Sequence, residues 1–193
     1  RQVCDEYKIL LIVDEIYTGF HRTGRFFACE HPEVVPDIIC LGKGLTGGFP
    51  LSACTGKSHV MDAWPRSGGE ALHTSTFLGH PVGCAMALAS IAEHEKPGVG
   101  ARAKNAGNLF RKALSGVQGA HLRGLGAMLG LELVCADGMP DSSAASHVVV
   151  EALKSGLIVL GGGPDGNVLS FAPTVDLTAE DAGWTGGLLA RLR

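Results

Sequence analysis

An unbroken apolar run at residues 9–13, Ile-Leu-Leu-Ile-Val, lies near the start of the chain and ends in Asp14-Glu15. A strand that is apolar on both faces is typical of the centre of a parallel sheet, where helices cover each side. Two further short apolar runs, Asp37–Leu41 and Leu51–Thr55, are bounded by glycine or proline and predict neighbouring strands. The first half of the chain is therefore predicted to be α/β, with a mostly parallel sheet and flanking helices.

The sequence pattern changes near Pro97. Before this residue, a stretch at 81–96 rich in alanine, leucine and methionine predicts a buried helix, and a long glycine- and hydroxyl-rich loop is expected before it at 65–80. After Pro97, helices and strands mix without strict alternation, which is typical of a small α+β domain. We therefore predict two domains, residues 1–96 and residues 97–193. In the second, helices are expected at 99–117, 142–154 and from Thr178, and strands at 128–134, 157–160 and 168–171.

The composition excludes several classes of protein. The 193 residues include 16 Lys and Arg against 19 Asp and Glu, without a block of like charges, which argues against a nucleic-acid-binding surface. With 46% hydrophobic residues the chain is not expected to be disordered. No apolar run reaches the length of about 18 residues that a membrane span needs. The chain begins with Arg1 rather than Met, so a fragment or a processed product is expected.

The six cysteines contain no C-x-x-C pair. Disulfide frameworks are typical of short, cysteine-dense secreted chains, so free thiols in a reducing compartment, the cytoplasm, are expected here. A metal site is not expected, because Cys29 and His31 have no second pair of ligands at close spacing. Cys40 lies on a strand predicted to be buried, and we interpret it as a core residue rather than a nucleophile.

Three residues stand at positions where chemistry is expected. Asp14 follows the most apolar strand, Lys43 follows the next strand between two glycines, and Thr76 lies in the hydroxyl-rich loop. Ligands gather at the carboxyl ends of the strands in open α/β sheets. Pyridoxal phosphate requires a lysine for a Schiff base, a carboxylate for its pyridine nitrogen and hydroxyls for its phosphate. Each residue also has a plainer interpretation, as a turn cap, a solvated lysine or an ordinary loop hydroxyl, and spacing alone does not decide.

Three segments, Leu11–Gly24, Pro36–Ala53 and His73–Pro81, resemble the class III (ω-amino acid) aminotransferases, which are fold-type I pyridoxal-phosphate enzymes. The segments occur in the family's order and close to its spacing. The likeness covers nearly the whole chain but only the later half of a family member. It implies that residues 1–96 are the C-terminal part of the large cofactor-binding domain and that residues 97–193 are the small C-terminal domain.

The resemblance also implies a role for each site residue. Asp14 matches the carboxylate that pairs with the pyridinium nitrogen, and Lys43 matches the lysine that carries the Schiff base and moves a proton between Cα and C4′. Thr76 matches the residue that reaches the cofactor phosphate of the neighbouring subunit, which implies a homodimer. Tyr17 stands where the family commonly has glutamine, and its phenol either hydrogen-bonds the cofactor's 3′-oxygen or packs under the ring.

The activity implied by the resemblance is transfer of an amino group from an amine or ω-amino acid to a keto acid, both small molecules. Many family members carry an arginine at the position of Ser170 that binds a substrate carboxylate, which serine cannot do. Unless Arg102 or Arg123 takes over this role, the difference argues against 2-oxoglutarate as the acceptor and makes an amine or ω-amino donor with pyruvate plausible. Other fold-type I enzymes (an aminomutase, a decarboxylase or a phospholyase) also keep Asp14 and Lys43. A non-catalytic truncated fragment is a further alternative, since the family's phosphate-binding loop normally lies upstream.

Overall fold

The computed structural model describes residues 1–65, 68–69 and 73–193. The chain divides into two compact units: the first comprises residues 1–21 and 25–97, and the second comprises residues 22–24 and 98–193. The predicted loop at 65–80 falls partly outside the described residues. None of the helices in the described ranges is long and apolar enough to cross a membrane.

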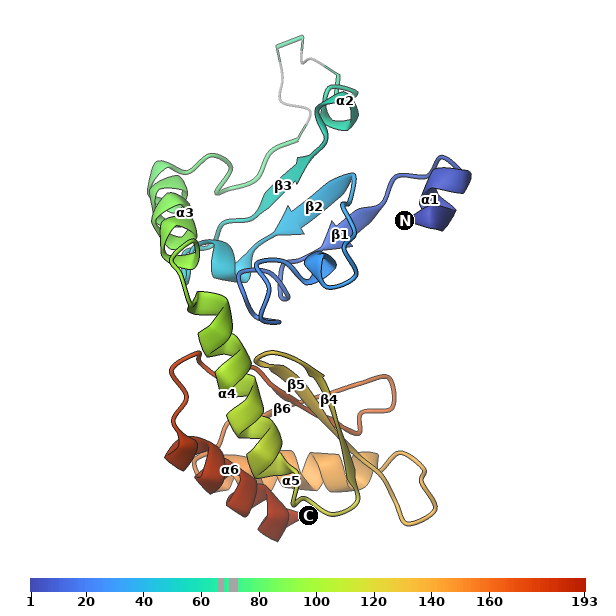
Figure 1. Ribbon diagram of the computed structural model, residues 1–193, viewed down its shortest axis with the longest axis vertical. Helices are drawn as coiled ribbons and strands as arrows, with labels where there is room; N and C mark the ends of the chain where they lie inside the picture. The colour runs from blue at the N-terminus through green and yellow to red at the C-terminus, as the bar shows by residue number, and fades with distance from the viewer. Residues whose placement is uncertain (66–67, 70–72) are drawn as a thin grey trace. The chain divides into compact units, whose positions relative to one another are not determined.

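The first unit contains a three-stranded sheet in the order β1-β2-β3, with β1 at Ile12–Asp14, β2 at Ile38–Leu41 and β3 at Ala53–Gly56 (Figure 1). β1 and β2 are parallel, whereas β2 and β3 are antiparallel. The segment 42–52 between β2 and β3 is too short for the helical crossover that a parallel pair needs, so the chain turns back on itself. The prediction of a parallel arrangement therefore holds for one of the two strand pairs.

The apolar run at 9–13 does not form a central strand within this unit. β1 is an edge strand, and Ile12 is 58% exposed. In the described parts of the chain β1 has a partner on one side only, so its outer residues lie open to solvent. The prediction that this strand is buried on both faces is therefore wrong for the chain by itself.

The helices of the first unit cover little of its sheet. The longest is α3, Pro81–His94, which begins as expected at a proline, and the His80 side chain accepts a hydrogen bond from the backbone N–H of Gly83. The prediction that this helix is buried is wrong, because Leu88 is 71% exposed and the helix buries one side only, against a small core around Phe20 and Leu45. The others are α1 (Gln2–Glu6), η1 (Ala28–Glu30), η2 (Lys43–Leu45) and α2 (Ser58–Met61).

Asp37 anchors the start of β2. Its buried carboxylate accepts hydrogen bonds from the Leu11 backbone N–H at 2.8 Å and from the Lys57 Nζ and Arg1 Nη1 atoms, both at 2.7 Å. The Leu11 N–H, and then Lys57 and Arg1, hold the pKa of the Asp37 carboxyl well below its usual range. This anchor was not predicted, because nothing local in the sequence distinguishes a buried, paired Asp before a strand from an exposed one.

This anchor predicts an acid-sensitive contribution to stability. The unfolded chain protonates Asp37 near pH 4 and the folded chain only at lower pH, so the unfolded state binds more protons in that interval. The contribution is therefore complete above about pH 5 and is lost as the pH falls toward the lowered pKa. We expect urea unfolding to show a smaller loss of stability between pH 7 and pH 3 in Asp37→Asn than in the wild type. Equal losses in both proteins would contradict the assignment.

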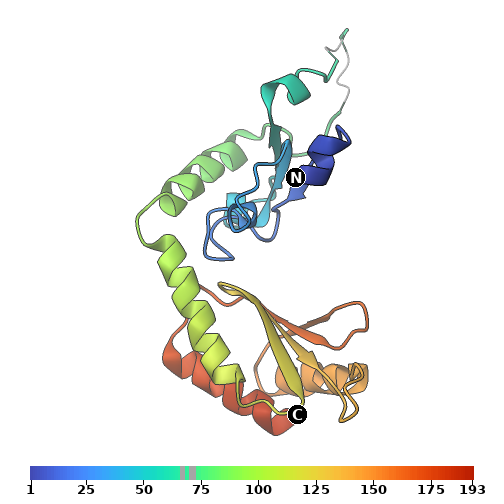
Figure 2. The same cartoon turned by 45° about the vertical axis from the view of Figure 1, so that its right-hand side comes forward.

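The second unit is a two-layer α+β structure. Its four-stranded sheet has the order β4-β5-β7-β6, with every neighbouring pair antiparallel. Alternate residues of β5 are buried, and the helices α4, α5 and α6 lie on one face of the sheet (Figures 1 and 2). The elements are α4 (Val99–Leu114), β4 (Ala120–Leu125), β5 (Met128–Leu133), α5 (Ser142–Lys154), β6 (Leu160–Gly162), β7 (Val168–Phe171) and α6 (Ala179–Leu192).

Local capping explains where two of these helices begin. The Asp141 side chain accepts from the backbone N–H of Ala144 at the start of α5. Thr178 and Asp181 form a reciprocal capping box at the start of α6. The predicted helix starts at Ser142 and Thr178 are confirmed to within a residue. Strand β4 was not predicted, and β6 lies slightly later than the strand expected at 157–160.

Residues 22–24 belong to the second unit because of specific hydrogen bonds. The Arg22 Nη1 atom donates to the Pro173 carbonyl at 2.7 Å, and the Arg22 carbonyl accepts from the Ala127 backbone N–H at 3.0 Å. The identity of the first unit as part of a cofactor domain, and of the second as a small C-terminal domain, remains a prediction.

Candidate functional site

The parallel pair β1 and β2 places Asp14 and Lys43 at the same edge of the sheet. Asp14 is the last residue of β1 and lies opposite Cys40, and the Glu15 N–H donates to the Cys40 carbonyl at 2.9 Å. β2 ends at Leu41, and Lys43 opens the short helix η2 directly after it. Two chemically distinct groups, a carboxylate and an amine, therefore follow the carboxyl ends of neighbouring parallel strands.

The two glycines beside Lys43 let the turn after β1 approach. A Cβ atom on Gly42 would lie 3.1 Å from the Ile16 Cγ2 atom, and one on Gly44 would lie 2.9 Å from the Phe20 Cβ atom. Both distances are shorter than ordinary van der Waals contact, so larger residues would push the turn away from η2. In this chain the glycines therefore make room for the protein's own side chains.

Lys43 is exposed and its backbone is strained. Its φ of +36° lies in the left-handed region, which costs a residue with a Cβ about 1 kcal/mol or more. Its Nζ atom lies 4.0 Å from the centroid of the Tyr17 ring. The cation faces an electron-rich ring, an attractive contact. The structure thus brings two of the four predicted site residues, Lys43 and Tyr17, into direct contact. A strained backbone at such a place is typical of a functional position.

Asp14 already has one partner in the turn. Its Oδ1 atom accepts from the Ile16 backbone N–H at 2.9 Å, so Asp14 does cap the turn, as the plainer interpretation expected. The side chain is exposed, and an ionised carboxylate has about four acceptor sites, so the cap leaves capacity for a second donor. Capping and ligand binding are compatible at this residue.

A cleft of about 960 Å³ opens beside Lys43, within the first unit. Lys43 and Thr76 both line it, together with residues of β2, of β3 and of the segment 73–79. Its volume is in the range of small-molecule sites. Cys40 also lines the cleft and is half-buried, so its interpretation as a core residue is only partly correct. Asp14 and Tyr17 do not line this cleft, although Tyr17 contacts Lys43.

Thr76 was predicted to contact the neighbouring subunit's cofactor, and Ser170 to stand where family members bind a substrate carboxylate. Thr76 is exposed and lines the cleft of its own chain. The prediction that it serves the neighbouring subunit remains a prediction. Ser170 lies on β7 of the second unit, opposite Gly130, and its residue is exposed. Its role beside a substrate carboxylate also remains a prediction.

Glu15 is a buried carboxylate that the sequence analysis did not single out. It is fully buried, and it accepts hydrogen bonds from the Thr18 hydroxyl and, at 2.8 Å, from the Cys29 backbone N–H. Burial, and then the Glu15 carboxylate, raise the pKa of the Cys29 thiol. Glu15 thereby ties the turn that carries Tyr17 to the segment around η1. Its place next to Asp14 was the only available signal, and it did not reveal burial.

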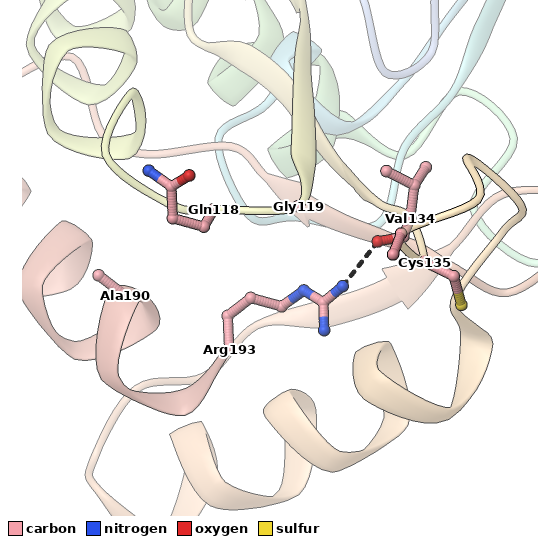
Figure 3. A pocket seen from close by; sticks show the side chains of 7 residues that line it. Gln118, Gly119, Val134, Cys135, Ala190 and Arg193 are labelled. Atoms are coloured by element: carbon pink, nitrogen blue, oxygen red, sulfur yellow. Dashed lines mark hydrogen bonds between the residues drawn. The ribbon is translucent and has the colours of Figure 1, made fainter.

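A second pocket, of about 320 Å³, lies in the second unit and is structural (Figure 3). The Arg193 guanidinium extends into it and donates to the Val134 carbonyl at 2.7 Å (Figure 3). It also pairs with the Asp141 carboxylate at 3.2 Å. These contacts tie the end of α6 to the end of β5. Among the described residues no group of three or more His, Cys, Asp or Glu is placed to hold a metal ion.

Comparisons with known proteins identify the family to which the sequence is similar. A family model described as "Aminotransferase class-III" matches residues 1–191. A 4-aminobutyrate aminotransferase of Mycobacterium leprae is 39% identical over 183 residues, which are 92% of this chain and 40% of that protein. An acetylornithine aminotransferase of Caldanaerobacter subterraneus is 38% identical and is matched over 94% of this chain and 44% of its own length. The chain thus spans less than half the length of these curated relatives.

Solved structures give the same result. A transaminase from the marine bacterium Virgibacillus superposes with a TM-score of 0.88 at 28% identity, over 100% of this chain and 46% of that one. An amine transaminase from an uncultivated Pseudomonas species, in its PLP-bound form, superposes with a TM-score of 0.84 at 32% identity, over 100% of this chain and 46% of that one. The fold expected from the sequence, part of a fold-type I subunit, is confirmed.

Proposed function

Since this chain belongs to the class III aminotransferase family, we propose that the full-length protein transfers an amino group from an amine or ω-amino acid to a keto acid. One observation carries the proposal: an exposed lysine on a strained backbone opens into a small-molecule cleft, at the sheet edge where the Asp14 carboxylate also emerges. That pairing of an amine and a carboxylate is the minimum that the reaction needs.

The residues of the site fit pyridoxal phosphate, the cofactor of this family. Lys43 offers an accessible amine, and the exposed Thr76 offers a hydroxyl for a phosphate, which the family match makes the phosphate of the cofactor in the neighbouring subunit. Asp14 has acceptor capacity beyond its turn bond. When bound, the cofactor supplies an aldehyde that takes up the amino group and a ring that withdraws electrons from the substrate Cα.

We assign the protein's own contributions as follows. The Lys43 Nζ atom would take the proton from the substrate Cα and deliver it to the C4′ carbon of the bound cofactor. The Asp14 carboxylate holds a proton on the ring nitrogen, which keeps the ring electron-poor. Tyr17, already beside Lys43, orients the site either through its hydroxyl or through its ring. The Thr76 hydroxyl would donate to the phosphate held in the neighbouring subunit's site.

The substrate class follows from the relatives and from one substitution. Relatives carry the names 4-aminobutyrate, acetylornithine and 5-aminovalerate aminotransferase, which supports an ω-amino donor. Ser170 lacks the positive charge that pairs with a carboxylate, and 2-oxoglutarate carries two carboxylates where pyruvate carries one. We therefore propose pyruvate rather than 2-oxoglutarate as the acceptor.

We also infer a homodimer and a cytoplasmic location. The homodimer is supported by the match of Thr76 to a residue that acts across subunits in this family. The location is supported by the cysteines, all six of which are free.

Product analysis tests the proposed activity. The full-length protein is given pyridoxal phosphate, 5-aminovalerate and either pyruvate or 2-oxoglutarate, and alanine and glutamate are quantified. We expect alanine to form, and Asp14→Asn to lower its rate by about 100-fold or more. Asparagine keeps the oxygen that accepts from Ile16, so the turn survives and the change isolates the charge.

The matched control is Asp62→Asn, which changes an exposed aspartate at the end of α2 and should leave the rate unchanged. Ammonia or phosphate release without consumption of keto acid would instead identify a lyase. A folded protein that binds pyridoxal phosphate and forms no product with any donor would favour the non-catalytic alternative.

A further inference from the structure

Three polar side chains lie in one row across the sheet of the first unit. Asp14 of β1 is opposite Cys40 of β2, and Cys40 is opposite Cys54 of β3. Residues paired in register carry their side chains on the same face of a sheet, so a carboxylate and two thiols are neighbours on one face. Only Asp14 has a role in the proposed function.

The two cysteines form the kind of pair that a disulfide can bridge. The Cys40 carbonyl accepts from the N–H of Glu15, the residue directly after β1, so the backbone groups of Cys40 face β1 and not β3. Cys40 and Cys54 are therefore a non-hydrogen-bonded antiparallel pair, whose Cα atoms lie about 4.5 Å apart and whose side chains are closest together. That separation is within the range of disulfides, about 4.4–6.8 Å.

The environment of the two sulfur atoms supports a direct contact. Burial raises the pKa of the Cys40 thiol, and the neighbouring Cys54 thiol and the Asp14 carboxylate raise it further. Cys54 is exposed, whereas Cys40 is half-buried. Both line the cleft beside Lys43, so a small reagent in that cleft can reach Cys54 first and Cys40 second.

We propose that Cys40 and Cys54 form a reversible disulfide across β2 and β3, on the wall of the Lys43 cleft. The pair is a redox site rather than a metal site, because no group of three or more ligand residues is placed to hold a metal in the described ranges. A reversible disulfide is compatible with a reducing compartment, where such bonds are transient and sense the thiol–disulfide balance.

The oxidant is a low-molecular-weight disulfide such as oxidised glutathione. The Cys54 thiolate attacks one sulfur of that molecule, which forms a mixed disulfide and releases one small thiolate. Cys40 then loses its proton to solvent, its sulfur attacks the Cys54 sulfur, and the second small thiolate leaves. The two protein thiols lose two electrons and two protons, and one small disulfide becomes two thiols.

Peptide mapping tests this proposal without reference to any enzyme activity. The folded full-length protein is incubated with oxidised glutathione, the remaining thiols are alkylated, and the digest is analysed by mass spectrometry. Cleavage after Lys43 separates the two cysteines. We expect a link between the peptides of Cys40 and Cys54, no glutathione on either, and full reversal by dithiothreitol.

Variants make the test specific. Cys40→Ser should trap glutathione on Cys54, and Cys54→Ser should leave Cys40 open to alkylation. Cys84→Ser, which removes an exposed cysteine on α3, should leave the link unchanged. The proposal would be overturned if the wild type kept glutathione on Cys54 while Cys40 stayed free, or if the link formed only after unfolding in urea. Because the disulfide is detected by peptide mapping, the test remains valid even if the protein shows no amino transfer.

Discussion

Lys43→Ala is expected to abolish the visible absorption band that pyridoxal phosphate gives in the full-length protein, and to lower amino transfer by about 10⁴-fold or more. The Nζ atom is the proposed point of attachment and the proposed proton carrier, and among the described residues that line the cleft no other side chain carries an amine. Alanine keeps the Cβ atom, so the strained backbone at φ +36° is unchanged and the fold should survive. Absorption spectra and the alanine-formation assay measure both effects.

The control for this prediction is Lys96→Ala, which removes an exposed lysine paired with Glu93 and should change neither the band nor the rate. A band that persists in Lys43→Ala would show that the attachment point is wrong. The same variant tests the proposed homodimer. If Thr76 serves the neighbouring subunit, mixing Lys43→Ala subunits with Thr76→Ala subunits restores part of the activity, because some dimers then contain one intact site. No restoration would favour the arrangement in which Thr76 serves its own cleft.

Gly107→Ala is expected to destabilise the second unit by at least about 3 kcal/mol. Gly107 lies on α4, and a Cβ atom there would come within 1.8 Å of the Gly126 carbonyl oxygen, in the turn between β4 and β5. The obstacle is backbone rather than a flexible side chain, so the helix and the hairpin must move apart. The gain in helix propensity from glycine to alanine, about 1 kcal/mol, is too small to offset this. Urea unfolding followed by circular dichroism measures the change.

Gly183→Ala is the matched control. It makes the same change inside another helix of the same unit, α6, but a Cβ atom there would meet nothing within 4 Å. We therefore expect it to raise the stability by about 0.5–1 kcal/mol. Similar effects of the two substitutions would show that α4 and the hairpin are not packed as described.

The local part of the fold was predictable because its causes lie within a few residues. Pro81 begins α3, and Asp141 and Thr178 cap the helices that follow them. Each of these signals acts on backbone groups within one helical turn, so it can be recognised from residues that are adjacent in the sequence. The burial of α3 was not predictable in the same way. An alanine-rich helix is apolar all round, and how much of it is covered depends on what the rest of the chain places against it.

Some site residues were predictable from their position after an apolar run, whereas contacts of others became visible only in the folded structure. Asp14 and Lys43 follow apolar runs, and the end of a parallel strand is a place for ligands whatever the details of the sheet. The contact between Lys43 and Tyr17 required the turn after β1 to fold back over η2, which Gly42 and Gly44 permit. Burial of Glu15 depends on Cys29, fourteen residues later, supplying a backbone donor.

The sequence alone thus contained the order of helix caps, strand ends and chemical groups, together with a family resemblance that predicts roles for Asp14 and Lys43. The folded molecule alone determined that β1 lies at an edge, that β3 runs antiparallel to β2, and that Cys40 and Cys54 face each other. The physical reason is that capping and turn preferences are local, whereas strand register and burial depend on which distant segments pair.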